Sequence, residues 1–329
     1  MSESTIAQLL KVLFGVLKDR RTVTYSNVAA LTILWYDTAL EMSREVEFIW
    51  RAKWSFPKAL YIIIRYYGLF HLGLTGIVET RTNIGAKVCR AYIWGISIAG
   101  AIVFSTLVNF VLLLRVHAIY GQSRRVLCFL VIVIMAEFAT EFYITFKVIL
   151  GTTFAQIAAI ESLFPGCIVQ SSELHLTLVC WIPALLISVL FFTMTIWKFY
   201  ISFRDEQKLT LQWGQALSPM LTAFIRDGTV FFLLIAVVLL ACTVTTATLR
   251  GPLLSFFVPW LLGVYSFAGS RLILGLREAA LKEGNEKTWD AMTLSTAAFN
   301  SNRTRIPHDT LSIEVDRYSL DHQRLAHSP

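Results

Sequence analysis

Charged residues are scarce in this chain. They make up only 16% of its 329 residues, whereas soluble domains average about 25%. Hydrophobic residues account for 56%, and the mean hydropathy is +0.61. Such a chain is too apolar for a soluble protein and too long for a single membrane anchor. Four stretches lack charged residues altogether, and each has the roughly 20 residues that a helix needs to cross a bilayer: 91–114, 174–197, 228–249 and 251–270.

Recognisable catalytic and metal-binding patterns are also missing from the sequence. The six histidines show no ligand-like spacing, and no Gly-x-Ser-x-Gly, Gly-x-Gly-Asp or glycine-rich phosphate loop is present. The last apolar stretch has no lysine that could carry a retinal Schiff base. We therefore expect no enzymatic activity, no catalytic residue, no metal and no cofactor. The net charge of +7 is not accompanied by a nucleic-acid-binding motif, so nucleic acid is not an expected partner.

Three further stretches are apolar apart from isolated ionisable residues, and they raise the expected number of transmembrane helices to seven: 22–42, 58–78 and 126–150. The sequence thus predicts an all-α polytopic membrane protein with a receptor-like bundle of seven helices over residues 22–277. Residues 1–21 contain an amphipathic segment expected to lie on the membrane. Residues 278–329 are polar and are expected to form a largely disordered cytosolic tail.

Lysine and arginine are distributed unevenly between the two sides of this bundle. The connections after the first, third and fifth helices, together with the C-terminal segment, hold 19 of them, and the opposite side holds nine. Because cytosolic loops are enriched in Lys and Arg, the count places the N-terminus outside and the C-terminus in the cytosol. We expect an integral, multi-pass protein of the plasma membrane.

Ionisable side chains within spans are costly and tend to find partners. Asp37 is expected about 22 Å below the outer edge of the first helix, and Arg65 about 10 Å above the inner edge of the second. These depths nearly coincide in a core of about 30 Å, which predicts a structural ion pair.

Glu137 and Glu141 share a face of the fourth helix. Two interpretations of this pair are open. The carboxylates line a cavity that binds a cation or a ligand, or that relays protons. Alternatively, both are capped by hydroxyl groups or by Asn109 of neighbouring helices.

Two of the five cysteines are expected on the outer face of the membrane. Cys89 lies where the chain enters the third helix, and Cys167 lies in the long connection between the fourth and fifth helices. Because that face is oxidising, a disulfide between them is allowed, and it would hold the connection over the bundle. The alternative is a pair of free thiols.

The segment Ala29–Tyr67 resembles the opening signature of a fungal family of seven-helix membrane proteins that carries the domain of unknown function 6533. A Tyr-Asp pair ends the first helix and is followed by an acidic-hydrophobic stretch, Ile-Trp, Lys-Trp and Arg-Tyr. The matching residues are Tyr36, Asp37, Glu45, Ile49, Trp50, Lys53, Trp54, Arg65 and Tyr66. The segment Leu114–Tyr120 (LRVHAIY) also resembles the family's third helix, with His117 in place of an aromatic residue. The resemblance implies a seven-helix fold and a fungal source, but no established activity.

The expected layout is also similar to that of G-protein-coupled receptors, with prolines Pro183 and Pro259 in the fifth and seventh helices. The likeness is one of architecture, because the acidic-Arg-Tyr triplet and the Asn-Pro-x-x-Tyr motif of those receptors are missing. We expect a receptor-like protein whose ligand site includes Glu137 and Glu141. The alternative is a proton-coupled or small-solute transporter that uses the same carboxylates. The expected partners are the lipid bilayer, a small-molecule ligand and a cytosolic signalling partner.

Overall fold

The structure is a computed structural model, and it describes residues 3–82, 84–121, 123–154, 165–167, 169–171, 178–213 and 219–278. Nearly all of these residues are helical. The elements in chain order are α1 (Glu3–Glu45), η1 (Val46–Trp50), α2 (Phe56–Thr80), α3 (Ala86–Tyr92), η2 (Ile93–Gly100), α4 (Ala101–Ile119), α5 (Arg124–Leu150), β1 (Thr152–Phe154), β2 (Val169–Ser171), α7 (Leu178–Trp213), α8 (Pro219–Thr248), η4 (Gly251–Ser255) and a final helix over 258–278.

Six helical stretches among the described residues are long and apolar enough to cross a membrane: Phe56–Thr80, Lys87–Ile119, Arg124–Val148, Leu178–Ile201, Gly228–Thr248 and Gly251–Glu278. The prediction of an all-α polytopic membrane protein is therefore confirmed. Helix α1 packs against α2 as a seventh helix and is less apolar than the other six. Several of its polar side chains are buried against the bundle, among them Asn27, Asp37 and Glu41.

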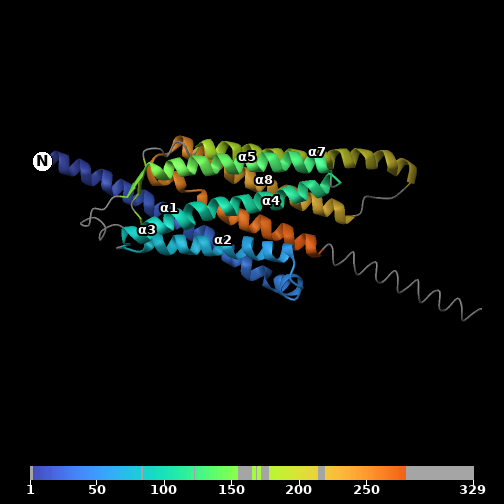
Figure 1. Cartoon of the computed structure of the whole chain (residues 1–329), viewed down its shortest axis with the longest axis horizontal. Coiled ribbons are helices and arrows are strands. Elements are labelled where there is room, and N and C mark those ends of the chain that lie inside the picture. Colours follow the sequence, from blue (N-terminus) through green and yellow to red (C-terminus); the bar gives the residue numbers. More distant parts are fainter. Residues whose placement is uncertain are drawn as a thin grey trace, which may run out of the picture. The chain divides into compact units, whose positions relative to one another are not determined.

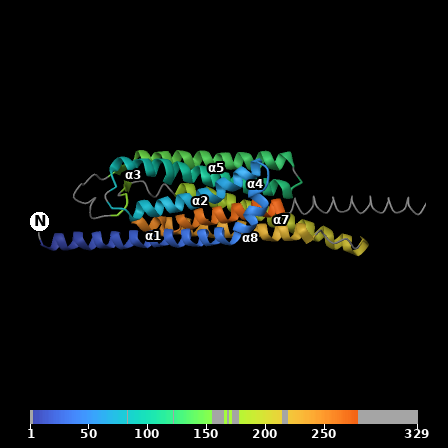
Figure 2. The same ribbon diagram turned by 90° about the horizontal axis from the view of Figure 1, so that it is seen from below.

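Helix α1 differs from the expectation for the N-terminal segment. Residues 1–21 were expected to form a separate helix on the membrane surface, but Glu3–Glu45 is one continuous helix of 43 residues. No glycine or proline interrupts the chain between residues 16 and 45, so nothing in the sequence breaks the helix at the membrane edge. Its length of about 65 Å is twice the thickness of a bilayer core. Figure 2 shows its N-terminal part extending past the end of α2.

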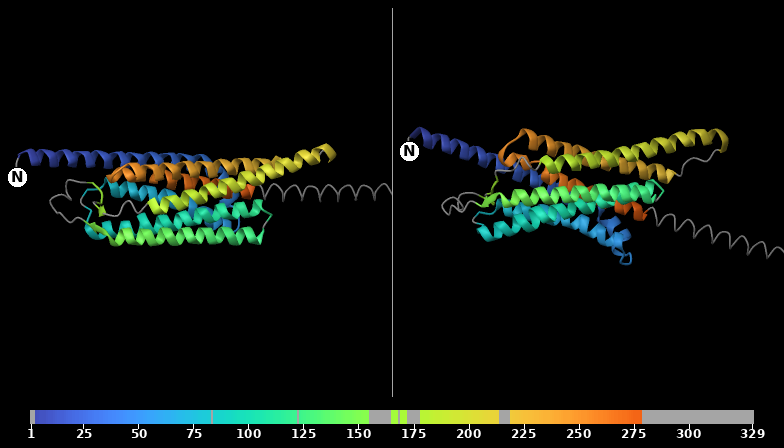
Figure 3. Two further views of the ribbon diagram at one scale, coloured as in Figure 1. Left: turned by 90° about the horizontal axis from the view of Figure 1, so that it is seen from above. Right: turned by 45° about the horizontal axis from the view of Figure 1, so that its top comes forward.

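The helices of the unit Met1–Arg277 run roughly side by side (Figures 1 and 3). Helix α4 contacts α2, α5 and α7, while α7 contacts α5 and α8. Large apolar side chains fill the interior, including Ile64, Leu112, Leu113, Phe191 and Phe232. Others are exposed along the helices, including Ile33, Ile132, Leu186 and Val237. An outer surface this rich in apolar side chains is unfavourable in water, so it indicates a lipid bilayer environment.

Small residues allow the final helix to pack closely on α2. A Cβ atom on Gly68 would lie 2.7 Å from the Cβ of Ser266, and one on Gly269 would lie 2.8 Å from Ile64 Cγ2. Ser266 Oγ also donates a hydrogen bond to the Ile64 carbonyl at 3.0 Å. Close approach of backbones at small residues is typical of helix packing in membranes. It brings residue 270 of the final helix against Arg65 of α2.

The connection after α5 contains a two-stranded antiparallel hairpin that the sequence did not predict. Strands β1 and β2 pair with Thr152 opposite Ser171 and Phe154 opposite Val169. Each strand has only three residues, which is too short for a recognisable alternating pattern. The predicted disorder of the C-terminal tail concerns residues 278–329, and of these only Glu278 belongs to the described part of the chain.

Candidate functional site

Three carboxylates lie on one face of α1, near its C-terminal end. Asp37, Glu41 and Glu45 are spaced four residues apart, so they project from successive turns of the same face. All three are buried. Like charges at this spacing destabilise an isolated helix, and burial raises the cost further. The fold therefore needs cations from other helices at this face.

Arg65 of α2 supplies the most deeply buried of these cations. Its Nη1 atom donates to Asp37 Oδ2 at 2.6 Å, and its Nε atom donates to Glu45 Oε1 at 3.1 Å. The Arg65 side chain is only 1% exposed. The Asp37–Arg65 pair inferred from matched depths is thus present, but Arg65 also binds a second carboxylate that the sequence argument did not include.

Glu45 is fully buried, with 0% of its side chain exposed. Besides Arg65, it accepts hydrogen bonds from the hydroxyl groups of Tyr61 at 2.6 Å and Tyr66 at 2.9 Å. All three donors come from α2, and Tyr61 and Arg65 are one helical turn apart. Charge-assisted hydrogen bonds of this kind are about twice as strong as neutral ones. They offset the loss of hydration that Glu45 suffers on burial.

Arg271 of the final helix provides the second cation. Its Nη2 atom lies 2.6 Å from Asp37 Oδ1, and its Nη1 atom lies 2.9 Å from Glu41 Oε1. Its side chain is 29% exposed, far more than that of Arg65. Arg44 adds a third cation, 2.9 Å from Glu41 Oε2. Three arginines therefore balance the three carboxylates.

We call the ion network the set of side chains that connects α1, α2 and the final helix at this end of the bundle: Asp37, Glu41, Glu45, Tyr61, Arg65, Tyr66, Ser270 and Arg271. Ser270 belongs to it because its Oγ atom accepts a hydrogen bond from Arg65 Nη1 at 3.1 Å. Sequence reasoning missed Glu41, Glu45 and Arg271 as members. The spacing of four residues along α1 was the available signal for the carboxylates, but Arg271 follows the last apolar stretch and was counted among the basic residues of the C-terminal segment.

A second arginine of the final helix lies beyond the ion network. Arg277 Nη1 donates to the Phe48 carbonyl at 3.0 Å, and Arg277 Nη2 donates to Ser55 Oγ. Both acceptors belong to the connection between α1 and α2. The last turns of the final helix are therefore held to the end of α1 by Arg271 and Arg277 together.

Glu137 and Glu141 of α5 face α4. Asn109 Nδ2 donates to Glu137 Oε2 at 3.0 Å, and Ser105 Oγ donates to Glu141 Oε2 at 3.3 Å. Both expectations for this pair remain open. The amide and the hydroxyl group are the capping partners that a structural role requires, and they are also polar groups that a ligand or a cation could replace.

Residues of the final helix interact with the carboxylate pair, through electrostatics, and with the ion network, through ion pairs. Tyr265 of this helix is buried and lies within electrostatic range of both Glu137 and Glu141. Arg271 follows six residues later, which corresponds to about 9 Å along the helix axis. A movement of the final helix would therefore alter the surroundings of both sites.

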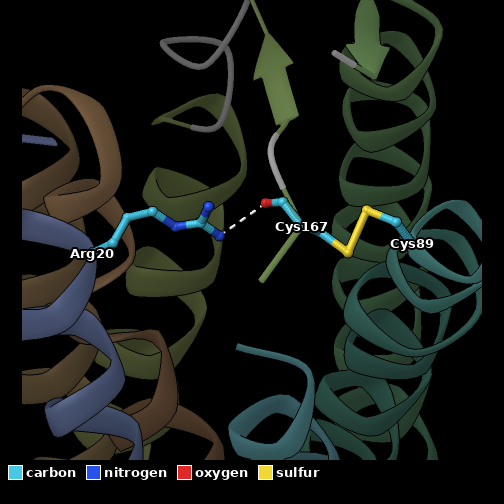
Figure 4. Close-up of a disulfide and its surroundings, with 3 residues drawn as sticks. All are labelled: Arg20, Cys89 and Cys167. Atoms are coloured by element: carbon cyan, nitrogen blue, oxygen red, sulfur yellow. Dashed lines mark hydrogen bonds between the residues drawn. A yellow bond between two sulfur atoms is a disulfide. The ribbon is translucent and has the colours of Figure 1, made fainter. Parts of the chain in front are cut away.

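The opposite end of the bundle is closed by a disulfide. Cys89 and Cys167 are joined, with their Cα atoms 5.6 Å apart (Figure 4). Arg20 of α1 donates from Nη2 to the Cys167 carbonyl at 2.8 Å. Burial lowers the pKa of the Arg20 guanidinium, and the nearby Glu79 carboxylate opposes this shift. The connection before α7 is thus attached to both α3 and α1.

No group of three or more His, Cys, Asp or Glu residues suited to a metal ion occurs in the described part of the chain. Neither a curated protein nor a solved structure matches the chain. Residues 25–70 match the model of a family of unknown function (DUF6533). This matched segment contains six of the eight side chains of the ion network, and only Ser270 and Arg271 lie outside it.

Proposed function

We propose that this protein is a receptor-like sensor of a small-molecule ligand in the plasma membrane, with its N-terminus outside and its C-terminus in the cytosol. A fungal source and seven membrane-spanning helices belong to the same proposal. The observation that carries it is the final helix, which enters the ion network at Arg271 and has Tyr265 within electrostatic range of the carboxylates of α5.

The carboxylate pair is the proposed ligand site. A ligand with a cationic or hydrogen-bond-donating group would replace Asn109 and Ser105 as the partner of Glu137 and Glu141. Their present hydrogen bonds, at 3.0 and 3.3 Å, are not charge-assisted on the donor side. A cationic group would bind the carboxylates more strongly than these neutral donors.

The ion network supplies the proposed element with two states. Arg271 is the more exposed of its two cross-helix arginines, with 29% of its side chain exposed against 1% for Arg65, so its release into water restores more of its hydration. Separation of Arg271 from Asp37 and Glu41 therefore costs much less than separation of the buried Arg65. A ligand needs only a few kcal/mol of differential affinity to shift such an equilibrium. The cytosolic end of the final helix would then move away from α1 and expose a surface for a signalling partner.

The competing function is a proton-coupled or small-solute transporter. It is favoured by the spacing of Glu137 and Glu141, which are one turn apart and could pass a proton along α5. Transport requires that these carboxylates be reached in turn from both sides of the membrane, whereas a receptor requires no net movement of protons.

Reconstitution in lipid vesicles that contain a pH-sensitive dye separates the two functions. We expect no proton flux above that of empty vesicles under an imposed pH gradient, with or without a membrane potential. The matched variants are Glu137→Gln, which neutralises the buried carboxylate, and Glu47→Gln, which neutralises an exposed one. Flux that disappears in Glu137→Gln but persists in Glu47→Gln would contradict the receptor proposal and favour the transporter.

A further inference from the structure

The connection between α1 and α2 combines exposed aromatic and basic side chains. Trp54 is 78% exposed and Phe56 is 65% exposed, and Trp50 is also exposed. Arg51 and Lys53 lie between the two tryptophans along the chain and are exposed as well. We call residues 50–56 the aromatic–basic loop.

The position of this loop places it at a membrane surface. It joins the C-terminal end of α1 to the start of α2, which is long and apolar enough to cross the bilayer. Tryptophan is enriched at membrane–water interfaces because its apolar ring and its N–H group favour different sides of the boundary. Two exposed tryptophans at the start of a span therefore indicate contact with the headgroup region of the lipids.

Contacts with the rest of the bundle fix the loop backbone. Lys58 is buried, and its Nζ atom donates to the carbonyl groups of Trp50 at 3.1 Å and Ala52 at 2.8 Å. The same Nζ atom lies 5.0 Å from the centre of the Trp54 ring, a distance that allows a cation–π interaction. Arg277 holds the loop from the other side through Ser55. The exposed groups are thus presented by an ordered segment.

The exposed charge of this surface is positive on balance. Arg51 and Lys53 contribute two exposed positive charges, and Glu47 in the preceding turn contributes one exposed negative charge. Lys58 and Arg277 are held by the backbone and side-chain acceptors described above. Each lysine or arginine near an anionic membrane surface favours binding by about 1 kcal/mol.

We propose that the aromatic–basic loop is a binding site for anionic phospholipid headgroups. Trp50, Trp54 and Phe56 lie at the boundary between headgroups and acyl chains, while Arg51 and Lys53 bind the phosphate and carboxylate groups of the lipid. This inference requires neither a ligand nor the receptor activity proposed above. The bound lipid would lie next to Glu45 and Arg277, where α1 meets the final helix.

The test uses the full chain in nanodiscs that contain equal amounts of phosphatidylcholine and phosphatidylserine. After transfer to detergent, native mass spectrometry counts the molecules of each lipid that stay bound. We expect the wild-type protein to retain phosphatidylserine in preference to phosphatidylcholine. The double variant Arg51→Gln/Lys53→Gln should lose about fivefold in this preference for each charge removed, which is the effect of about 1 kcal/mol.

The matched control is Lys18→Gln/Lys87→Gln, which removes two exposed charges at the opposite end of the bundle. The control should keep the preference, and a Trp54→Ser variant should lower the retention of both lipids without changing their ratio. Absence of a phosphatidylserine preference in the wild type, or an equal loss in the control, would overturn the proposal. Unchanged lipid retention in Trp54→Ser would overturn the assigned role of the aromatic side chains.

Discussion

The Arg65→Met substitution removes the cation that lies between Asp37 and Glu45. Methionine retains an unbranched apolar side chain but leaves Glu45 buried, with only the Tyr61 and Tyr66 hydroxyl groups as partners that the structure records. Loss of one partner of a buried ion pair costs about 3–5 kcal/mol, because the remaining charge is uncompensated. We expect Arg65→Met to lower the free energy of unfolding by this amount.

Asp37→Asn should be milder, because both arginines that contact Asp37 retain another carboxylate. Arg65 keeps Glu45, and Arg271 keeps Glu41. Loss of charged hydrogen bonds without a stranded buried charge corresponds to about 1–3 kcal/mol. The double variant should cost less than the sum of the two single changes, by about 0.5–3 kcal/mol, since the two side chains are in contact.

Unfolding by sodium dodecyl sulfate in mixed micelles, followed by circular dichroism, gives the free energies for this double-mutant cycle. Arg204→Met is a suitable control because it replaces an exposed arginine on α7, and it should change the free energy little. The reasoning would be refuted if Arg65→Met cost no more than Asp37→Asn, or if the two changes were strictly additive.

Three further predictions concern other parts of the chain. Replacement of Cys89 and Cys167 by serine opens a connection of 78 residues and should destabilise by up to roughly 4 kcal/mol; equal melting temperatures in the wild type and the double variant would contradict this. Gly68→Ala should destabilise by about 1–3 kcal/mol because its methyl group overlaps Ser266, whereas Gly73→Ala on the same helix meets no atom within 4 Å and should not; similar unfolding curves would refute the close packing. The N-glycosylation site at Asn302, in the tail that is proposed to be cytosolic, should carry no glycan in mass spectra of expressed protein. A glycan there would reverse the proposed orientation.

Much of the helical layout could be predicted from the sequence because lipid restricts charge so strongly. The described residues of each predicted span lie within an observed helical stretch or end one residue beyond it, while residues 174–177 of the fifth span are outside the described part of the chain. The continuity of α1 could not be predicted in the same way. A change from apolar to polar composition marks where a membrane ends, but it does not mark where a helix ends if no glycine or proline is present.

The ion network was predictable only in part. Matched depth identified Asp37 and Arg65 because they lie on consecutive predicted spans, which must cross the membrane in opposite directions. Arg271 joins them from 206 residues further along the chain than Arg65, and its contact depends on how closely the final helix packs at Gly68. Single-sequence patterns contain no information on such packing, so the arginine was indistinguishable from the other basic residues of the C-terminal segment.

The most direct test of the proposed function is the distance between α1 and the final helix. Spin labels at Leu40 and Leu276, both exposed, report this distance by double electron–electron resonance once the three free cysteines are replaced. We predict one narrow distribution for the wild-type protein and an additional, longer distance in Arg271→Gln, because that change separates the final helix from Asp37 and Glu41. Identical distributions in both proteins would show that Arg271 does not hold the final helix, and would contradict the two-state element on which the receptor proposal depends.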